Sequence, residues 1–342
     1  MSELETVAPP PEAAARRPRR FRALRAILLP VFVAALGWFV WTQRAALAEA
    51  AQAPPRDLAL IALLFAVAHF LNSVEFTLLF RAMGARMGVL ENWMLFTAGQ
   101  LANHLPGQIG SIYRWRYMKS VHGVGYSGSL AVYGANLVIT FAGAAAAGLV
   151  GVAGSALTGG ARSLLMALIF GAMAVGAVVA AGMRIPALSA RYRGGSFERH
   201  VDELREGAER LRAEPGMALG VCLLEAIKYV VTAWRLQVTF GLIGIAQPFW
   251  VFLVLAPAAG VASFIGFTPA ALGFREAFVT AAGVAMGITL TGGLLGATVD
   301  RAVMLATFLV LGGIGLAYTW PRLRRAEAAG GATPVAAGRV NG

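Results

Sequence analysis

Residues Asn103–Lys119 read NHLPGQIGSIYRWRYMK, and this stretch decides the fold that we expect for the chain. It follows an apolar run, Trp93–Leu101, that is too short to cross a bilayer. Pro106 and Gly107 then interrupt any helix, because proline lacks a donor N–H and glycine tolerates backbone angles that other residues avoid. A broken helix survives at membrane depth only where protein or a wet cavity surrounds its freed backbone groups. The stretch therefore predicts a re-entrant helical hairpin, the kind of element at which transporters bind substrate.

Cations alternate with aromatic side chains after this break. The cations are Arg114, Arg116 and Lys119, and the aromatic residues are Tyr113, Trp115 and Tyr117. Guanidinium groups bind phosphate through two parallel hydrogen bonds, and aromatic rings favour the headgroup level of a bilayer. The pattern favours an anionic amphiphile as ligand, either a phospholipid or a lipid-linked phosphate.

The composition is that of an integral membrane protein. Hydrophobic residues make up 58% of the chain and charged residues only 13%. The net charge of +12 comes almost wholly from arginines that lie beside apolar runs, which is the positive-inside pattern of a membrane protein rather than a nucleic-acid-binding surface. The sequence contains no CxxC, HExxH or DxD motif, so we expect no metal site and no cofactor.

Apolar runs predict an all-α, polytopic protein with about six transmembrane helices. The runs are Ala26–Gln43, Leu58–Phe80, Tyr126–Gly154, Arg162–Met183, Gly216–Gly244 and Leu294–Trp320. The first hairpin covers Glu91–Arg114. A second hairpin, Trp250–Gly287, is broken at Pro269 and Gly273. Both hairpins contain Pro-x-x-x-Gly, and with six crossings they enter from opposite sides, so the topology predicts an inverted repeat with a shared site.

Basic clusters at the ends of the runs predict a cell (inner) membrane protein with both termini in the cytoplasm. We expect residues 1–25 to be a disordered basic tail, 26–320 the membrane domain, 184–215 a charged cytoplasmic linker and 327–342 a disordered tail. Ala46-Leu47-Ala48 resembles a signal-peptidase site, so a cleaved signal peptide at residues 1–48 stays open.

Two spans carry stripes of polar residues. One stripe comprises His69, Asn72 and Glu75, and the other comprises Glu225, Lys228, Thr232, Arg235 and Thr239. Their spacing places each stripe on one helical face. The stripes are either interhelical hydrogen-bonding groups, with Glu225 and Lys228 a neutralised pair, or the lining of a substrate or proton path.

Two short motifs resemble those of a known family. The first is Asn103-x-x-Pro106-Gly107-x-x-Gly110-x-x-x-Arg114, and the second is Thr268-Pro269-x-x-x-Gly273-x-Arg275-Glu276. Together they are similar to the motifs of the lysylphosphatidylglycerol synthase transmembrane, or flippase-like, family, over roughly residues 25–320.

The resemblance implies a membrane domain that moves aminoacylated or other lipids between leaflets. The family's synthase activity resides in a separate soluble domain, and the soluble segments here are too short for one, so we expect no aminoacyl transfer. The predicted lipid-binding residues are Asn103, Pro106, Gly107, Gly110, Arg114, Arg116, Pro269, Gly273, Arg275, Glu276 and Arg301.

Three functions remain at this point. The first is a lipid translocase or transporter whose partner is a membrane lipid. The second is an accessory or scaffold protein for a lipid- or glycan-modifying membrane enzyme. The third is a membrane enzyme, for which no acid–base constellation is legible in the sequence.

Overall fold

The described part of the chain is helical and contains no strand. The computed structural model describes residues 53–104, 109–160, 163–182, 215–262 and 273–330, together with single residues at 41, 209 and 213. By its internal contacts the chain divides into residues 1–44 and 45–342, and the description below concerns the second unit. The predicted span 26–43, the predicted basic tail, most of the predicted linker and the last twelve residues of the C-terminal tail lie outside the described residues.

Five described helices are long and apolar enough to cross a membrane. They are α3 (Pro55–Ala82), α6 (Tyr126–Leu157), α7 (Leu164–Gly182), α9 (Pro215–Leu242) and α12 (Leu290–Ala328). Each coincides with a predicted span, so the prediction of an all-α, polytopic membrane protein is confirmed. The last helix runs past the predicted end at Trp320, because the Arg, Leu, Ala and Glu residues that follow Pro321 are good helix formers.

Four shorter helices form two pairs at the positions of the predicted hairpins. They are α4 (Val89–Ala102), α5 (Ile109–His122), α10 (Phe249–Ala262) and α11 (Phe274–Ala285). The longest have 14 residues, and 14 residues of helix extend only ~21 Å against a hydrocarbon core of ~30 Å. None of the four is long enough to cross alone. Residues 105–108 and 263–272, with Pro106, Gly107 and Pro269, lie outside the described residues.

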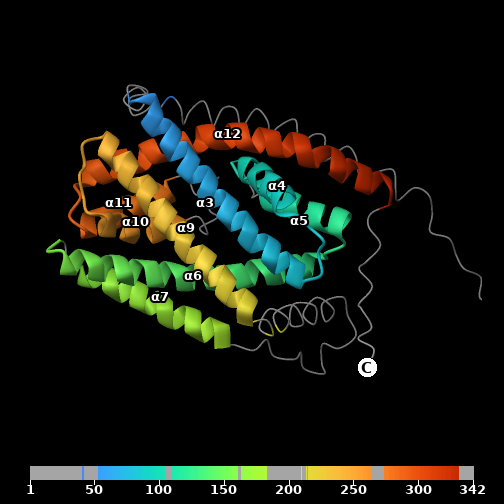
Figure 1. Ribbon diagram of the computed structural model, residues 1–342, viewed down its shortest axis with the longest axis horizontal. Coiled ribbons are helices and arrows are strands. Elements are labelled where there is room, and N and C mark those ends of the chain that lie inside the picture. Colours follow the sequence, from blue (N-terminus) through green and yellow to red (C-terminus); the bar gives the residue numbers. More distant parts are fainter. Residues whose placement is uncertain are drawn as a thin grey trace, which may run out of the picture. The chain divides into compact units, whose positions relative to one another are not determined.

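Each short helix pair packs on a long helix that is distant in sequence: α4 packs on α12, and α10 packs on α6. The ribbon in Figure 1 shows α4 against α12, α9 beside α3, and α6 beside α7, and the residue contacts agree. Two apolar cores result. One surrounds Phe80 and Tyr117 near α3, α4 and α5, and the other surrounds Phe240 and Phe252 near α9, α10 and α11. Each short pair is thus built into its own core.

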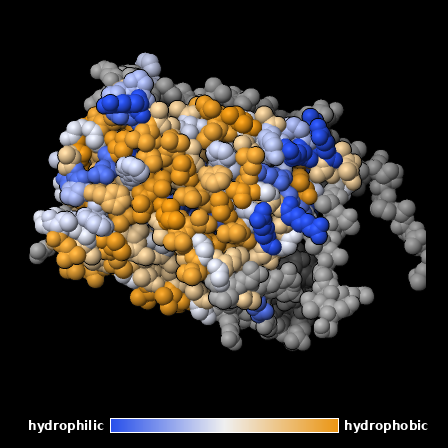
Figure 2. Space-filling view, viewed as in Figure 1, coloured by the Kyte–Doolittle hydropathy of each residue, from blue (hydrophilic) through white to orange (hydrophobic). Residues whose placement is uncertain are grey.

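The outer faces of the long helices are apolar. Figure 2 shows hydrophobic side chains across the face formed by α3 and α9, with hydrophilic side chains gathered toward the helix ends. Leu219 and Leu223 on α9 are 73% and 60% exposed, and Leu63 on α3 is 59% exposed. A continuous apolar surface of this kind fits contact with lipid chains better than contact with water.

Candidate functional site

The first hairpin is closed by two residues of its motif. A Cβ added to Gly110 on α5 would collide with the carbonyl oxygen of Gly99 on α4, so only glycine allows the two helices to approach this closely. The Asn103 side-chain oxygen accepts a hydrogen bond from the Ser111 backbone N–H at 3.2 Å. Asn103 thereby satisfies a free amide at the start of α5. Both residues position the helix that carries Arg114.

In the second hairpin, a side-chain oxygen likewise accepts a hydrogen bond from a backbone N–H at the start of a helix, here α11. Gly273 has a φ of +82°, a backbone conformation that favours glycine. Its N–H donates to the Glu276 side chain at 2.9 Å. These contacts fix the first turn of α11, on which Arg275 and Glu276 stand.

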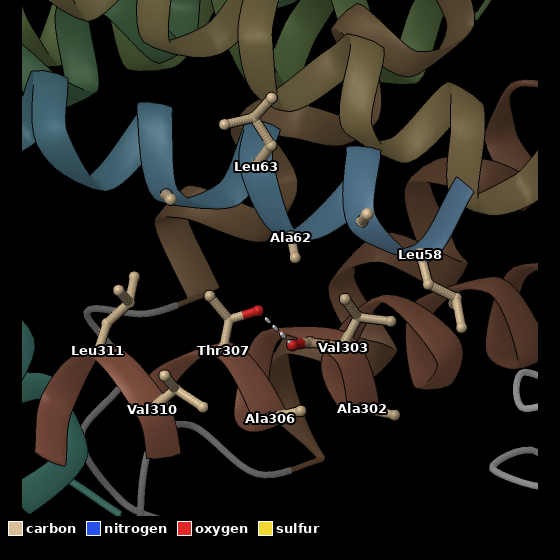
Figure 3. Close-up of a pocket in the computed structure, with 11 residues that line it drawn as sticks. Leu58, Ala62, Leu63, Ala302, Val303, Ala306, Thr307, Val310 and Leu311 are labelled. Atoms are coloured by element: carbon tan, nitrogen blue, oxygen red, sulfur yellow. Dashed lines mark hydrogen bonds between the residues drawn. The ribbon is translucent and has the colours of Figure 1, made fainter. Parts of the chain in front are cut away.

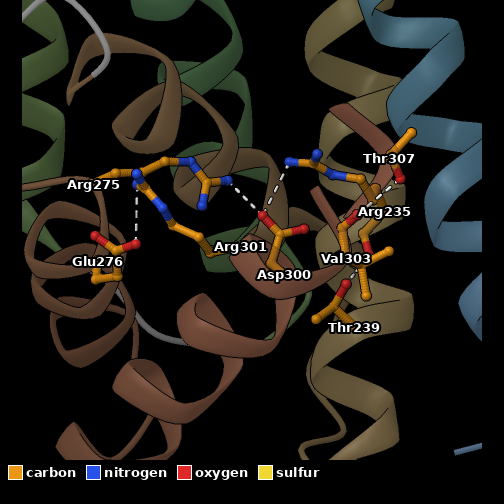
Figure 4. A network of polar contacts seen from close by, with 8 residues as sticks. All are labelled: Arg235, Thr239, Arg275, Glu276, Asp300, Arg301, Val303 and Thr307. Atoms are coloured by element: carbon orange, nitrogen blue, oxygen red, sulfur yellow. Dashed lines mark hydrogen bonds and ion pairs between the residues drawn. The ribbon is translucent and has the colours of Figure 1, made fainter. Parts of the chain in front are cut away.

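An arginine network joins α9, α11 and α12 (Figure 4). Arg235 Nη2 lies 3.2 Å from Asp300 Oδ2, and Arg275 Nη2 lies 2.5 Å from the same oxygen, so the two guanidinium groups reach Asp300 from two helices. Arg301 Nη1 lies 3.1 Å from Glu276 Oε1. We refer to Arg235, Arg275, Glu276, Asp300 and Arg301 as the arginine network.

The arginine network is buried and carries an excess of positive charge. Asp300 is fully buried and none of the five residues is more than 8% exposed. Three guanidinium groups face two carboxylates. Arg235 Nε and Arg275 Nη1 have no hydrogen-bond partner in the part of the chain that the structure describes. Buried cations in excess of buried anions favour the binding of an additional anion.

A second buried arginine lies in the first hairpin. Arg114 is 5% exposed, and its guanidinium carbon lies 4.7, 4.5 and 5.1 Å from the ring centres of Phe76, Phe96 and Tyr133. The described residues provide it with aromatic faces, which attract a cation, but with no carboxylate. Its Nη2 has no hydrogen-bond partner among them.

Tyr133, beside Arg114, belongs to a group of three buried donors. The Tyr133 hydroxyl, the Trp115 Nε1–H and the Ser129 hydroxyl have no hydrogen-bond partner within the described residues. The Trp115 and Tyr133 rings lie 5.9 Å apart, and Ser129 is one helical turn before Tyr133 on α6. All three groups can donate a hydrogen bond, so the region around Tyr133, which contacts Arg114, also suits an anion.

Aromatic rings connect Arg114 with the arginine network, and we refer to these two sites as the arginine centres. Phe96, beside Arg114, lies 5.4 Å from the ring of His69, which lies 4.3 Å from the ring of Phe65. The guanidinium carbon of Arg235 lies 5.1 Å from Phe65. Phe308 of α12 packs on both Phe65 and His69, with ring centres 4.7 Å from each. The rings bring residues of α3, α4 and α12 together between Arg114 and Arg235.

The two polar stripes meet at the contact between α3 and α9. Lys228 Nζ donates to Asn72 Oδ1 at 3.2 Å and to Glu75 Oε2 at 3.1 Å, and it also contacts Glu225 Oε2. Glu75 and Glu225 are fully buried, and the Lys228 side chain is 15% exposed. Lys228 thus contacts carboxylates from both helices. We refer to Glu75, Glu225 and Lys228 as the acid cluster.

The remaining sequence-predicted cation, Arg116, lies elsewhere. Its guanidinium pairs with Glu327 near the end of α12, and the Arg116 side chain is 51% exposed. Glu327 is 26 residues beyond Arg301 on the same helix, a separation of ~39 Å. The structure therefore brings Arg275, Glu276 and Arg301 together and places Arg116 apart from them.

Sequence reasoning missed the aromatic residues of the site. Tyr133, Phe65, Phe96 and Phe308 look like ordinary members of apolar runs. The spacing of Ser129, Tyr133 and Asn136 was a usable signal, because these polar groups share one face of an otherwise apolar helix.

Residues 25–312 match the family described as the lysylphosphatidylglycerol synthase TM region. A search of curated proteins found no match to the chain.

Proposed function

Because the chain belongs to the lysylphosphatidylglycerol synthase TM region family, whose members are membrane proteins tied to lipid metabolism or transport, we propose that it moves an anionic amphiphile between the leaflets of a membrane. The ligand is an anionic phospholipid or a lipid-linked phosphate. The protein acts as a translocase and catalyses no covalent step.

The observation that carries this proposal is the excess of buried guanidinium groups. Arg114 has no carboxylate partner among the described residues, and three arginines of the arginine network face only two carboxylates. Ionisable groups inside a membrane are costly and mark the paths of polar substrates. Phosphate oxygens are the acceptors that a guanidinium fork binds best. A phosphate-bearing headgroup would neutralise either centre.

An apolar groove beside the arginine network supports an amphiphile rather than a free anion. The groove has a volume of about 670 Å³ and lies between α3 and α12 (Figure 3). Its lining residues are Leu58, Ala59, Ala62, Leu63, Ala66, Ala302, Val303, Ala306, Thr307, Val310 and Leu311. Val303 and Thr307 follow Asp300, the partner of Arg235, by three and seven residues on α12. A headgroup at Arg235 can therefore keep an acyl chain in this groove.

The two arginine centres suit successive positions of the headgroup. We place both chain termini in the cytoplasm of a cell membrane protein, on the evidence of the basic residues that flank the spans. In this orientation Arg114, which packs on Phe76 near the C-terminal end of α3, lies on the cytoplasmic side of Arg235. Arg235 is seven residues, or ~10 Å, from the opposite end of α9. The headgroup would pass the rings of Phe96, His69 and Phe65 between these centres.

Transport of a fluorescent phosphatidylglycerol analogue tests the proposal in vesicles that contain the purified protein. We expect Arg114→Gln and Arg275→Gln each to slow leaflet exchange at least tenfold, because each removes a guanidinium that would bind the headgroup. Arg116→Gln is the matched control, since it changes an exposed arginine of the same stretch that is paired with Glu327. It should leave the rate unchanged.

Size-exclusion chromatography in detergent establishes that each variant is folded before its rate is compared. Wild-type rates in a folded Arg114→Gln/Arg275→Gln double variant would contradict the proposal. If a membrane enzyme lost activity without this protein, and the protein itself moved no lipid, the result would support the scaffold function instead.

A further inference from the structure

The acid cluster between α3 and α9 has more buried carboxylates than cations. Lys228 Nζ is the one ammonium group that contacts both Glu75 and Glu225 in the described structure. Glu75 Oε1 and Glu225 Oε1 have no hydrogen-bond partner among the described residues, and both residues are fully buried. When both carboxylates are ionised, the cluster has one uncompensated negative charge inside the protein.

We propose that Glu75 and Glu225 share one exchangeable proton, so that the acid cluster is a proton-binding site. Protonation of one carboxyl group leaves one carboxylate and one ammonium, which is a neutral combination. It also supplies an O–H donor for an oxygen that has no partner. Among the described residues, no group of three His, Cys, Asp or Glu side chains is arranged to hold a metal ion, and a proton is the ligand that the two carboxylates and the ammonium fit.

The surroundings of the acid cluster contain few other charges. From α9, Tyr229 packs beside Glu225 and donates to the Thr140 carbonyl at 3.3 Å, and the exposed Cys222 stands three residues before Glu225. From α6, Gly143 packs against the Glu225 side chain, and from α10, Gly260 packs against Tyr229. From α3, Asn72 and His69 complete the environment. Lys228 is the only cation in contact with the two carboxylates within the described part of the chain.

The acid cluster lies close enough to the arginine network for the two to influence each other. Lys228 and Arg235 stand seven residues apart on one face of α9, a separation of ~10 Å. His69 lies between them on the facing helix, and its Nδ1 has no hydrogen-bond partner among the described residues. Gain or loss of a proton in the cluster thus changes the electrostatic potential at the arginine network. This step rests on the proposed function: proton binding is coupled to headgroup binding, and a proton gradient drives the lipid.

Infrared difference spectroscopy of the wild-type protein in lipid nanodiscs detects the proton without reference to transport. We expect a protonated-carboxyl C=O band that titrates between acidic and alkaline buffer, and its loss in both Glu75→Gln and Glu225→Gln. Each single variant retains one carboxylate for Lys228, so each should fold. Glu327→Gln, which changes the exposed partner of Arg116, should keep the band. An unchanged band in both Glu75→Gln and Glu225→Gln would overturn the proton site.

Vesicles with an imposed pH gradient then test the coupling. Wild-type transport of the phosphatidylglycerol analogue should follow the gradient, whereas Glu75→Gln should move the analogue only down its own concentration gradient. Transport that follows the pH gradient equally in Glu75→Gln would overturn the coupling. A wild-type protein that shows the titrating band but moves no lipid would contradict the proposed function and leave the proton site standing.

Discussion

At the scale of single residues, the sequence identified the charged residues of the motifs but not the residues that they contact. Arg114 and Arg116 belong to one short run, yet two residues of helix turn through ~200°, so they face opposite sides. One is buried among rings, and the other is paired with Glu327. The partner of Arg235, in contrast, is Asp300, which lies 65 residues away in the sequence. No periodicity relates such residues, so only the packing of α9 on α12 reveals the contact.

The charge balance of the acid cluster predicts unequal effects of substitution. Lys228→Met leaves the buried carboxyl groups of Glu75 and Glu225 without their cation and should destabilise the protein by roughly 3–5 kcal/mol. The double variant Glu225→Gln/Lys228→Met leaves only Glu75 and should recover part of that loss. Thermal unfolding in detergent measures both. Strictly additive effects would show that Glu225 and Lys228 do not interact.

A surface pair provides the reference for these measurements. Arg116→Gln removes the exposed pair with Glu327 and should cost about 1 kcal/mol or less, because solvent screens exposed charges. A loss as large as that of Lys228→Met would mean that burial does not explain the difference between the two sites.

Glu91, at the start of α4, predicts a dependence of stability on pH. Burial opposes its ionisation, but hydrogen bonds from His122 and from the Tyr117 hydroxyl outweigh burial and hold the pKa of Glu91 below its ordinary value of 4.5. A lowered folded-state pKa stabilises the protein above the ordinary value, and this stabilisation is lost as pH falls through the folded-state pKa. Unfolding temperatures measured from neutral to acidic pH should fall more steeply in the wild type than in Glu91→Gln. Parallel curves would contradict the assignment.

At the scale of elements, the sequence predicted the five described spans to within a few residues at most ends, because long apolar runs have few alternatives in a membrane protein. It also located both helix pairs, since Pro and Gly interrupt their apolar runs. It did not predict how elements pair. The groove between α3 and α12 arises because small side chains such as Ala62 and Ala306 meet there, and neither helix identifies its neighbour from its own pattern.

The groove predicts a steric effect on transport. Ala306→Phe places an aromatic ring in the groove and should slow exchange of the phosphatidylglycerol analogue several-fold, while headgroup binding measured by native mass spectrometry persists. Ile314→Phe, on the same helix but outside the groove lining, is the matched control and should be neutral. Equal rates in both variants would show that the acyl chain does not use this groove.

At the scale of the whole molecule, the account depends on a topology in which each hairpin returns to the side from which it enters. Leu90 and Tyr126 flank the first hairpin, and Ala246 and Leu290 flank the second, all at exposed positions. In a Cys222→Ser background, single cysteines at the first two positions should react with an impermeant thiol reagent from the cytoplasm. Cysteines at the other two should react from outside. Reaction of the two flanks of one hairpin from opposite sides would contradict the topology.

The central claim is that the protein carries an anionic headgroup across the membrane, and leaflet exchange by the wild-type protein tests it most directly. Vesicles with and without the protein receive fluorescent phosphatidylglycerol or phosphatidylcholine analogues that have the same acyl chains. The account predicts that the protein accelerates exchange of the phosphatidylglycerol analogue at least tenfold more than exchange of the phosphatidylcholine analogue. Equal acceleration of both analogues, or of neither, would contradict it.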